Sequence, residues 1–301
     1  MRLARLFLVG HLIALAFGLM GLLYVIPNLG QFAGDSSAMR VYEFGLTYAG
    51  SLHMIFGALA MFSFGGATIG WRKTGVFFAA AFPISLGFEL VGTGTGYPFG
   101  NYAYTEFLGY KVLGHVPFSI PLSWFYVGFA CYLLGFLIAD RFGLKRLAVW
   151  SVGLGVWFLT VWDLVLDPAM AHESLAVKFW VWFETGPYLG MPLQNFVGWS
   201  ATGLIFMTVA RLLWRQDLVA ERGKLTDGAW FPLVVYFSNS LFAIALSASV
   251  GLWQPILLSA VLGLGPALLA WNPRRRGDAR RDVRSASEGD TGQPWRPAPS
   301  R

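Results

Sequence analysis

The chain has 301 residues, of which 56% are hydrophobic and only 13% are charged, and its mean hydropathy is +0.56. Soluble domains carry about 25% charged residues, so this composition indicates an integral membrane protein. The one cysteine, Cys131, excludes an intramolecular disulfide and a cysteine-based metal site. The four histidines are scattered, which argues against a di-iron centre. The net charge of +6 does not indicate nucleic-acid binding, because the basic residues lie in short loops and a tail.

The apolar segments of the chain predict its fold. A transmembrane helix needs about 20 mostly apolar residues. Eight such segments follow one another, at roughly 4–27, 46–69, 75–96, 118–139, 146–166, 190–214, 229–249 and 253–271. The first is too long for the apolar core of a signal peptide, so we retain it as a span. The sequence therefore predicts an all-α, polytopic membrane helical bundle.

The basic side chains predict the orientation of this bundle. With the N-terminus inside, nineteen of the 22 Lys and Arg residues fall in the inner loops and the tail. This bias favours a protein of the cell (inner) membrane with both termini in the cytoplasm. We expect residues 1–271 to form one transmembrane domain, and residues 272–301 to form a basic, disordered tail that can rest on anionic lipid. No internal repeat is visible, so a transporter built from inverted repeats has no support.

Polar residues inside the spans gather toward their outer ends. Glu89 lies about two turns before the outer end of the third span, and Asp163 and Asp167 share one face at the end of the fifth. Asn195 opens the sixth span, and we expect Pro168 to stop the fifth. A carboxylate costs roughly 3 kcal/mol or more at the bilayer centre, so it suggests a functional site. The plainer interpretations are a Glu that reaches the interface, capping by the Asp pair, and an interhelical hydrogen bond from Asn195.

A loop rich in glycine and aromatic residues follows Glu89. Glycine lets the backbone approach a flat apolar ligand closely, and aromatic rings can line its site. No strand precedes these glycines, so they do not form a nucleotide-binding motif. The residues that the two longer outer loops offer for binding a ligand are Tyr97, Asn101, Tyr102, Tyr104 and Glu184. Regions distant in sequence thus place polar groups at similar depth, which favours one shared site.

Four blocks of sequence resemble a known family. They read FELVGTGTGYPFGNYAYT, GHVPFSIPLSWF, WDLVLDPAM and WVWFETGPYLGMPLQNFVGW. They are similar, in this order, to the membrane carotenoid 1,2-hydratases of the CruF type and to the related bisanhydrobacterioruberin hydratases. The resemblance covers roughly residues 40–250. It implies addition of water across the terminal C1=C2 double bond of an acyclic ψ end group, as in lycopene or γ-carotene, to give a tertiary 1-hydroxy carotenoid without a cofactor.

This chemistry assigns roles to the candidate residues. A proton must reach C2, and water must capture the tertiary cation left at C1. Burial among apolar groups favours the protonated form of a carboxyl, so we expect Glu89 to be the acid. We expect Asp163 to hold the water, with Asp167, Asn195 and Tyr102 to orient it. Ring faces stabilise a cation by about 0.5–2 kcal/mol each. The rings expected to do so are Trp162, Trp199, Tyr97 and Tyr104.

The expected substrate is a rigid polyene about 30 Å long, comparable to the bilayer core. It should enter sideways from the lipid, through an apolar cleft that ends near Glu89, Asp163 and Asn195. Membrane lipids and other enzymes of the carotenoid pathway are the further partners we expect. Two alternatives stay open at this stage. One is a carotenoid cyclase or isomerase that uses the same protonation, and the other is a non-catalytic membrane transporter or lipid-binding protein.

Overall fold

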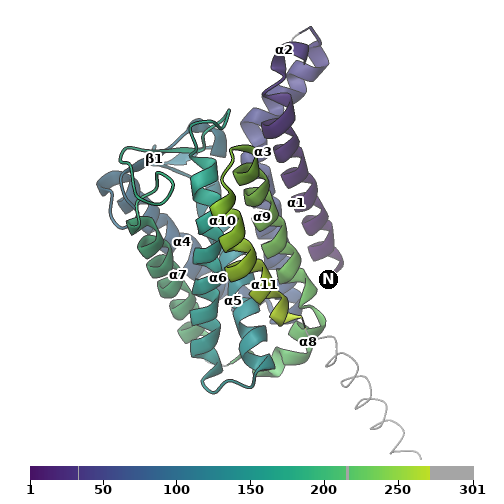
Figure 1. The fold of residues 1–301 in the computed structure, drawn as a ribbon. Helices are drawn as coiled ribbons and strands as arrows, with labels where there is room; N and C mark the ends of the chain where they lie inside the picture. Colours follow the sequence, from purple (N-terminus) through teal and green to yellow (C-terminus); the bar gives the residue numbers. More distant parts are fainter. Residues whose placement is uncertain (33, 215–216, 272–301) are drawn as a thin grey trace, which may run out of the picture.

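The computed structural model describes residues 1–32, 34–214 and 217–271, so the expected tail at 272–301 lies outside the described residues. In these ranges, eight helical segments are long and apolar enough to cross a membrane. They run approximately parallel in one bundle (Figure 1), which confirms the all-α prediction. Their bounds are Arg2–Val25, Ser36–Thr68, Trp71–Thr95, Ser119–Arg141, Leu147–Met170, Gln194–Leu213, Trp230–Ser249 and Trp253–Ala270.

The helices that form these spans keep one order along the chain. The first span joins α1 to a π-helical turn, and the last joins α10 to a π-helical turn, α11 and a 3-10 turn. The helices are α1 (Arg2–Met20), α2 (Leu29–Phe32), α3 (Ser36–Thr68), α4 (Trp71–Thr95), α5 (Ser119–Arg141), α6 (Leu147–Met170), α7 (Gln194–Leu213), α8 (Arg222–Asp227), α9 (Trp230–Ser249), α10 (Trp253–Leu258) and α11 (Gly265–Ala267). The short strands are β1 (Tyr102–Tyr104), β2 (Lys111–Val112), β3 (Val116–Pro117) and β4 (Trp180–Trp182).

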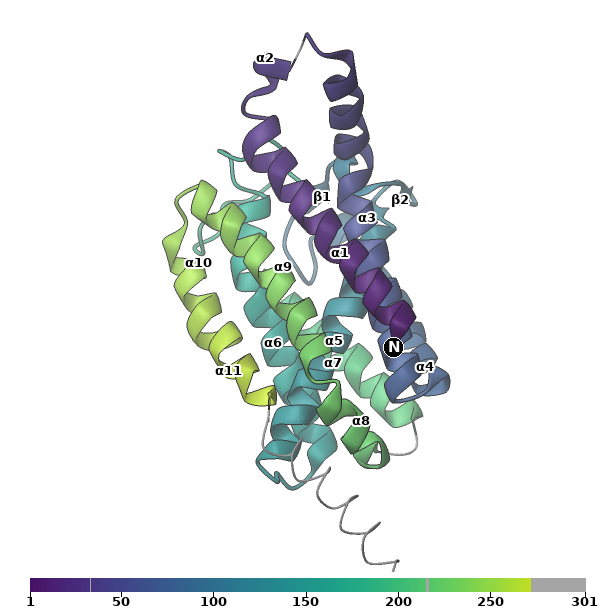
Figure 2. The ribbon, with the colours of Figure 1, turned by 90° about the vertical axis from the view of Figure 1, so that its right-hand side faces the viewer.

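Helix α3 begins ten residues before the expected start of the second span. The Asp35 carboxylate caps it, accepting hydrogen bonds from the backbone N–H groups of Ser37 (2.8 Å) and Ala38 (3.2 Å). The resulting 33-residue helix is ~50 Å long, which exceeds the bilayer core. The hairpin of α1, α2 and α3 therefore extends beyond the other helices at the top of Figure 2.

Helix α5 is the central helix of the bundle, and almost all of its residues are buried. It packs against α3, α4, α6, α7 and α9. Its closest contact is with α6, where glycines meet. A Cβ atom added to Gly135 would lie 2.6 Å from the carbonyl oxygen of Ser151, and one added to Gly155 would lie 3.0 Å from the Cα atom of Tyr132. Small residues at such a crossing let two membrane helices approach closely.

The prediction that Pro168 stops the fifth span is wrong, because α6 continues to Met170. A proline in the last turn cannot donate a hydrogen bond to the carbonyl four residues earlier, which is that of Leu164. The hydroxyl of Tyr188 donates to this carbonyl instead, at 3.0 Å. The loop that follows α6 thus satisfies the group that the proline leaves free, and the helix keeps its final turn.

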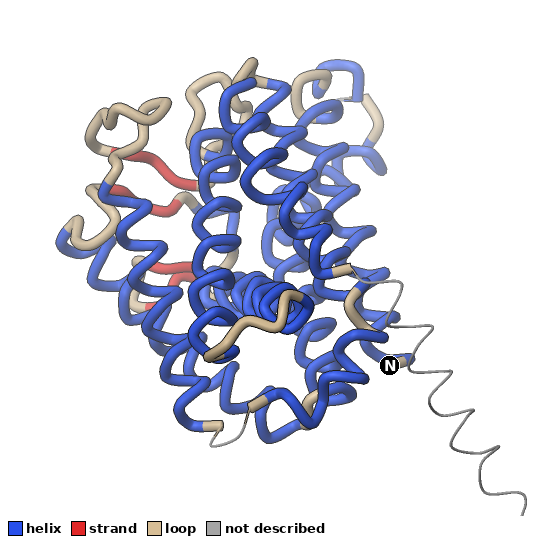
Figure 3. The backbone as a smooth tube through the Cα atoms, turned by 60° about the horizontal axis from the view of Figure 1, so that its bottom comes forward, coloured by secondary structure: helices blue, strands red, loops and turns tan. Residues whose placement is uncertain are grey.

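The loops that follow α4 and α6 fold into a cap over one end of the bundle. Strands β1 and β4 pair antiparallel, with Tyr102 opposite Trp182 and Tyr104 opposite Trp180. Side chains of directly opposed residues point to the same face of a sheet, and alternate residues share that face. All four rings therefore lie on one face, whereas Val181 is exposed on the other. Figure 3 shows these strands in red beside the ends of the helices.

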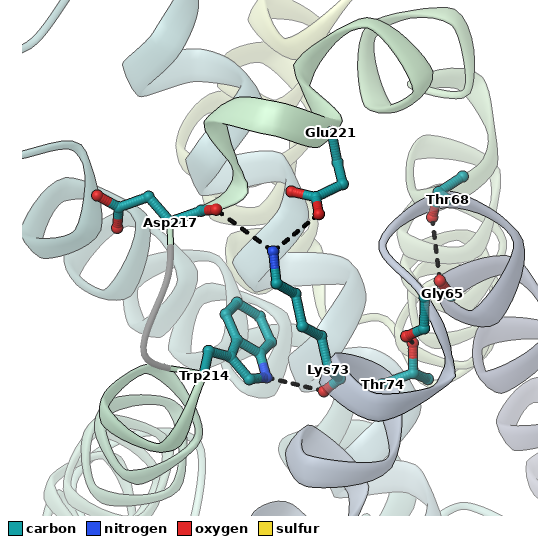
Figure 4. A network of polar contacts seen from close by, with 8 residues as sticks. Gly65, Thr68, Lys73, Thr74, Trp214, Asp217 and Glu221 are labelled. Atoms are coloured by element: carbon teal, nitrogen blue, oxygen red, sulfur yellow. Dashed lines mark hydrogen bonds and ion pairs between the residues drawn. The ribbon is translucent and has the colours of Figure 1, made fainter.

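The opposite end of the bundle is held by partly buried ion pairs. The Lys73 ammonium lies 2.8 Å from the Glu221 carboxylate and donates to the Asp217 carbonyl at 3.3 Å (Figure 4). The Trp214 indole donates to the Lys73 carbonyl at 2.8 Å. These contacts join the start of α4 to the connection between α7 and α8. The charged end and the cap thus lie at opposite ends of the helices (Figure 1).

Candidate active site

A cavity of about 60 Å³ lies under the cap, between the cap-side halves of the helices. Most of its walls are aromatic, and several polar groups project into it. The wall residues that carry its chemistry are Glu89, Tyr102, Tyr104, Trp124, Trp162, Asp167, Trp180, Trp182, Asn195 and Trp199. They come from α4, α5, α6, α7 and both strands of the cap, so only the folded bundle brings them together.

Glu89 is the first carboxyl group of this cavity. Its side chain is only 3% exposed, and both of its oxygens are occupied by donors. The Tyr102 hydroxyl and the Tyr104 hydroxyl (2.8 Å) donate to one oxygen, and the Trp124 indole (2.9 Å) donates to the other. These three donors favour the ionised form of the carboxyl, whereas its burial favours the neutral form. The ion pairs formed by the described Lys and Arg residues all lie elsewhere.

The two phenols beside Glu89 remain neutral. Burial, followed by the negative charge of Glu89, raises the pKa of Tyr102 and of Tyr104 well above the ordinary value of a tyrosine. Both groups lie in β1, outside the spans. A phenol that keeps its proton across the physiological pH range is a permanent hydrogen-bond donor. The cap therefore supplies Glu89 with donors that do not depend on pH.

Asp163 and Asp167 lie one turn apart on α6 and form a pair of carboxyl groups, which we call the Asp pair. The Asn195 amide nitrogen donates to both, at 2.9 Å to Asp163 and 2.5 Å to Asp167. Asp167 lines the cavity, whereas Asp163 is fully buried and does not. The second oxygen of Asp163 has no hydrogen-bond partner among the described residues. Two buried carboxyls that share one neutral amide cannot both be ionised cheaply, so this arrangement favours a shared proton.

Stacked rings form part of the cavity wall that also holds Glu89 and Asp167. The ring centroids of Trp124 and Trp199 lie 4.0 Å apart at an interplanar angle of 23°. Trp162 meets the Trp199 ring edge-on at 5.7 Å. On the cap side, Trp182 lies 5.2 Å from the Tyr102 ring. Faces of this kind attract a cation once it is removed from water.

The cavity also holds indole N–H groups that have no hydrogen-bond partner among the described residues. They belong to Trp162, Trp180 and Trp182, and all three side chains line the cavity. Buried donors are nearly always paired, with protein or with water. Three such donors in one cavity create positions where a water molecule or a hydroxyl group can be held.

The structure brings most of the sequence-predicted residues into this site. Eight of them meet in it or directly behind its wall: Glu89, Asp163, Asp167, Tyr102, Tyr104, Trp162, Asn195 and Trp199. Three do not. Tyr97 is 70% exposed, because Gly96 ends α4 in the left-handed conformation and turns the chain outward. Asn101 and Glu184 are also exposed, and the Glu184 carboxylate accepts a hydrogen bond from the Asn101 backbone N–H at 2.8 Å. These two residues shape the cap and do not line the cavity.

Several residues of the candidate site were missed by the sequence analysis. Trp124 holds Glu89, yet it lies in a helix that is apolar on every side, where periodicity gives no orientation. Tyr126 and Asn239 line the wall opposite the cap, and the Tyr126 hydroxyl donates to the Asn239 amide oxygen at 2.8 Å. His53 also lines the cavity. A polar residue in the middle of a span was the available signal for Asn239 and His53.

Among the described residues, no group of three or more His, Cys, Asp or Glu side chains is arranged to hold a metal ion. The chain belongs to the carotenoid biosynthesis protein family, whose sequence model matches residues 49–266. All of the cavity residues named above lie within that range. The chain is also similar to the bisanhydrobacterioruberin hydratase of Haloarcula japonica, with 32% identity over 268 residues, which cover 87% of this chain and 83% of that protein. These matches confirm the resemblance seen in the four sequence blocks. No solved structure matches the chain.

Proposed function

We propose that this protein is a carotenoid 1,2-hydratase, which adds water across the terminal C1=C2 double bond of an acyclic ψ end group. Lycopene and γ-carotene carry such an end group. The observation that carries the proposal is that Glu89 and Asp167, two separate carboxyl groups, face one aromatic cavity. Hydration needs one group to give a proton and another to take one. The hydratase name of the relative from Haloarcula japonica supports the same reaction class.

In the proposed first step, Asp167 gives its proton to C2. The π electrons of the C1=C2 bond form the new C–H bond, and C1 becomes a tertiary cation. Asp163 and Asn195 support this step, because the negative charge left on Asp167 is shared with the hydrogen-bonded group behind it. The stacked faces of Trp124 and Trp199 stabilise the cation, by about 0.5–2 kcal/mol for each ring it meets.

In the second step, a water molecule near Glu89 attacks C1 with an oxygen lone pair. Glu89, held as an anion by its three donors, accepts the proton that this water loses. The proton then returns to the Asp pair through water, so the enzyme is unchanged and one water has been added to the substrate. The three unpaired indole N–H groups are suited to hold the attacking water. Every step uses side chains and water, and no cofactor takes part.

This order reverses the roles expected from sequence, where Glu89 gives the proton and Asp163 holds the water. Deuterium exchange distinguishes the two assignments. In D₂O, an acid that adds and then removes a proton at C2 leaves deuterium in the recovered alkene. We expect Glu89→Gln to retain exchange without forming product, and Asp167→Asn to lose both. Asp227→Asn, at the exposed far end, should behave as wild type. Exchange lost in Glu89→Gln but kept in Asp167→Asn assigns the acid to Glu89.

Expression in cells that accumulate lycopene tests the reaction itself. We expect extracted pigments to include a carotenoid heavier by the mass of one water, with a tertiary hydroxyl at C1. A new pigment of unchanged mass identifies a cyclase or isomerase and refutes hydration. Unaltered pigments, with the protein present in the membrane, refute both reactions and favour a non-catalytic role.

A further inference from the structure

A second and larger cavity, of about 430 Å³, adjoins the first. Three residues line both: His53, Met170 and Phe242. The second cavity runs between α1 and α3, and we call it the α1–α3 groove. Its walls are mainly apolar, with residues such as Phe17, Leu22 and Leu46. The site under the cap and the α1–α3 groove therefore meet at these three residues.

The dimensions of the groove suit an extended chain. Its lining on α3 runs from Asp35 to His53, which is ~27 Å along a helix. This length approaches the span of a bilayer core, about 30 Å, and hence that of a rigid forty-carbon polyene. The wall of the groove from the first span runs from Ala14 to Val25, and Leu23 and Tyr24 in this stretch are exposed. A single helical layer thus separates the groove from the surroundings of the bundle on this side.

The junction of the two cavities is held by polar contacts. His11 Nδ1 on α1 lies 2.7 Å from the His53 carbonyl oxygen, which can only accept, so this nitrogen donates. The other ring nitrogen of His11 lies 3.0 Å from the Asn239 amide nitrogen and accepts from it. The His53 ring stacks on Phe242 with a centroid distance of 6.0 Å. These contacts fix α1 against α3 and α9 where the groove meets the site.

From this continuity, length and apolar lining, we propose that the α1–α3 groove binds the polyene chain of the substrate while its reacting end group lies between Glu89 and Asp167. This inference rests on the proposed function. The far end of the groove, at Asp35, Ser37 and Tyr42, is polar and receives the distal end of the molecule. The groove holds the chain straight, and the junction at His53 sets how far the end group reaches into the site.

Two glycines allow the groove to be filled with little disturbance of the fold. Both Gly18 and Gly21 line it. A Cβ atom added to Gly21 meets nothing within 4 Å, and one added to Gly18 comes only to 3.8 Å from the Phe242 ring. Gly18→Phe and Gly21→Phe therefore place a ring in the groove. Gly153→Phe is the matched control, because Gly153 is helical, exposed and equally free of neighbours.

The experiment measures two quantities on each full-length protein: the polyene that co-purifies from lycopene-making cells, and the hydration of two substrates. One substrate is lycopene, and the other is a ten-carbon acyclic alkene with the same end group, which is too short to occupy the groove. We expect both groove variants to lose bound polyene and lycopene hydration by about ten-fold or more, equivalent to ~1.4 kcal/mol. Hydration of the short alkene, and all activities of Gly153→Phe, should stay near wild type.

The possible results separate this inference from the proposed function. Groove variants that bind and hydrate lycopene like wild type overturn the inference and leave the function intact. Equal loss of both substrates also overturns it, because the damage then lies in the site and not in the groove. Phospholipid that co-purifies without any polyene assigns the groove to lipid chains. Polyene that is bound and displaced as expected, but never hydrated, refutes the function and retains the groove.

Discussion

The three donors on Glu89 give the sharpest test of its role, through Tyr104→Phe. This substitution removes one hydroxyl that lies 2.8 Å from the carboxylate and keeps the ring. A hydrogen bond to a charged group contributes ~1.5–3 kcal/mol. If Glu89 must be ionised to accept the proton from water, losing part of that stabilisation lowers its ionised fraction at neutral pH and hence kcat/KM, by about 10–100-fold. The backbone carbonyl of Tyr104, which accepts from Lys111 at 2.8 Å, is untouched.

The pH profile gives the direction of the effect. Hydrogen bonds to the ionised carboxyl favour that form, so their loss means that a higher pH is needed to reach it. We expect the rising limb of the pH–rate profile to shift to higher pH in Tyr104→Phe. Part of the lost activity should then return in alkaline buffer. Tyr110→Phe, at a ring that is 77% exposed, is the control and should match wild type. If Glu89 is instead the proton donor, Tyr104→Phe should have unchanged or higher activity at neutral pH. That result would refute the assignment of Glu89 as the proton acceptor.

Two further predictions concern packing and orientation. A Cβ atom added to Gly198 would lie 2.4 Å from the Phe99 ring, so Gly198→Ala should displace this cavity wall and lower activity and thermal stability together, by ~1–3 kcal/mol in unfolding free energy. A Gly153→Ala protein that loses as much stability would show that the Phe99 contact is not responsible. Reporter fusions after Arg301 and near Lys111 should give opposite signals, because nineteen of the 22 basic side chains lie on the predicted inner side. Matching signals contradict the predicted orientation.

The sequence predicted the spans well, because hydrophobic length is set by the bilayer and is visible in composition. The exception is the start of α3, where the residues after Asp35 include Arg40 and Glu43. These charges lower the hydropathy without breaking the helix, and the Asp35 cap determines where it begins. Hydropathy reports what can lie in lipid, whereas a helix can continue into water whenever its end is capped.

The carboxyl groups of the site were also predictable, since a charge in a span is costly and Glu89, Asp163 and Asp167 are conspicuous for that reason. The residues that surround these carboxyl groups could not be predicted from the sequence. Each paired strand of the cap is only three residues long, too short for an alternating pattern to show that Tyr102 faces Trp182. The turn at Gly96 decides that Tyr97 points away, and its left-handed conformation follows from the folded loop.

The fate of the cation decides between hydration and cyclisation in the proposed mechanism. A tertiary cation at C1 can be captured by water or by the next double bond of the same chain, and the second route closes a ring. Ring closure requires only the flexible end group to fold back on itself within the site, so a straight polyene in the groove does not prevent it. Capture by water requires a water molecule close to C1. The indole N–H groups of Trp162, Trp180 and Trp182, which have no hydrogen-bond partner among the described residues, can hold such a water in the cavity. These unpaired donors thus favour hydration over ring closure by supplying the nucleophile.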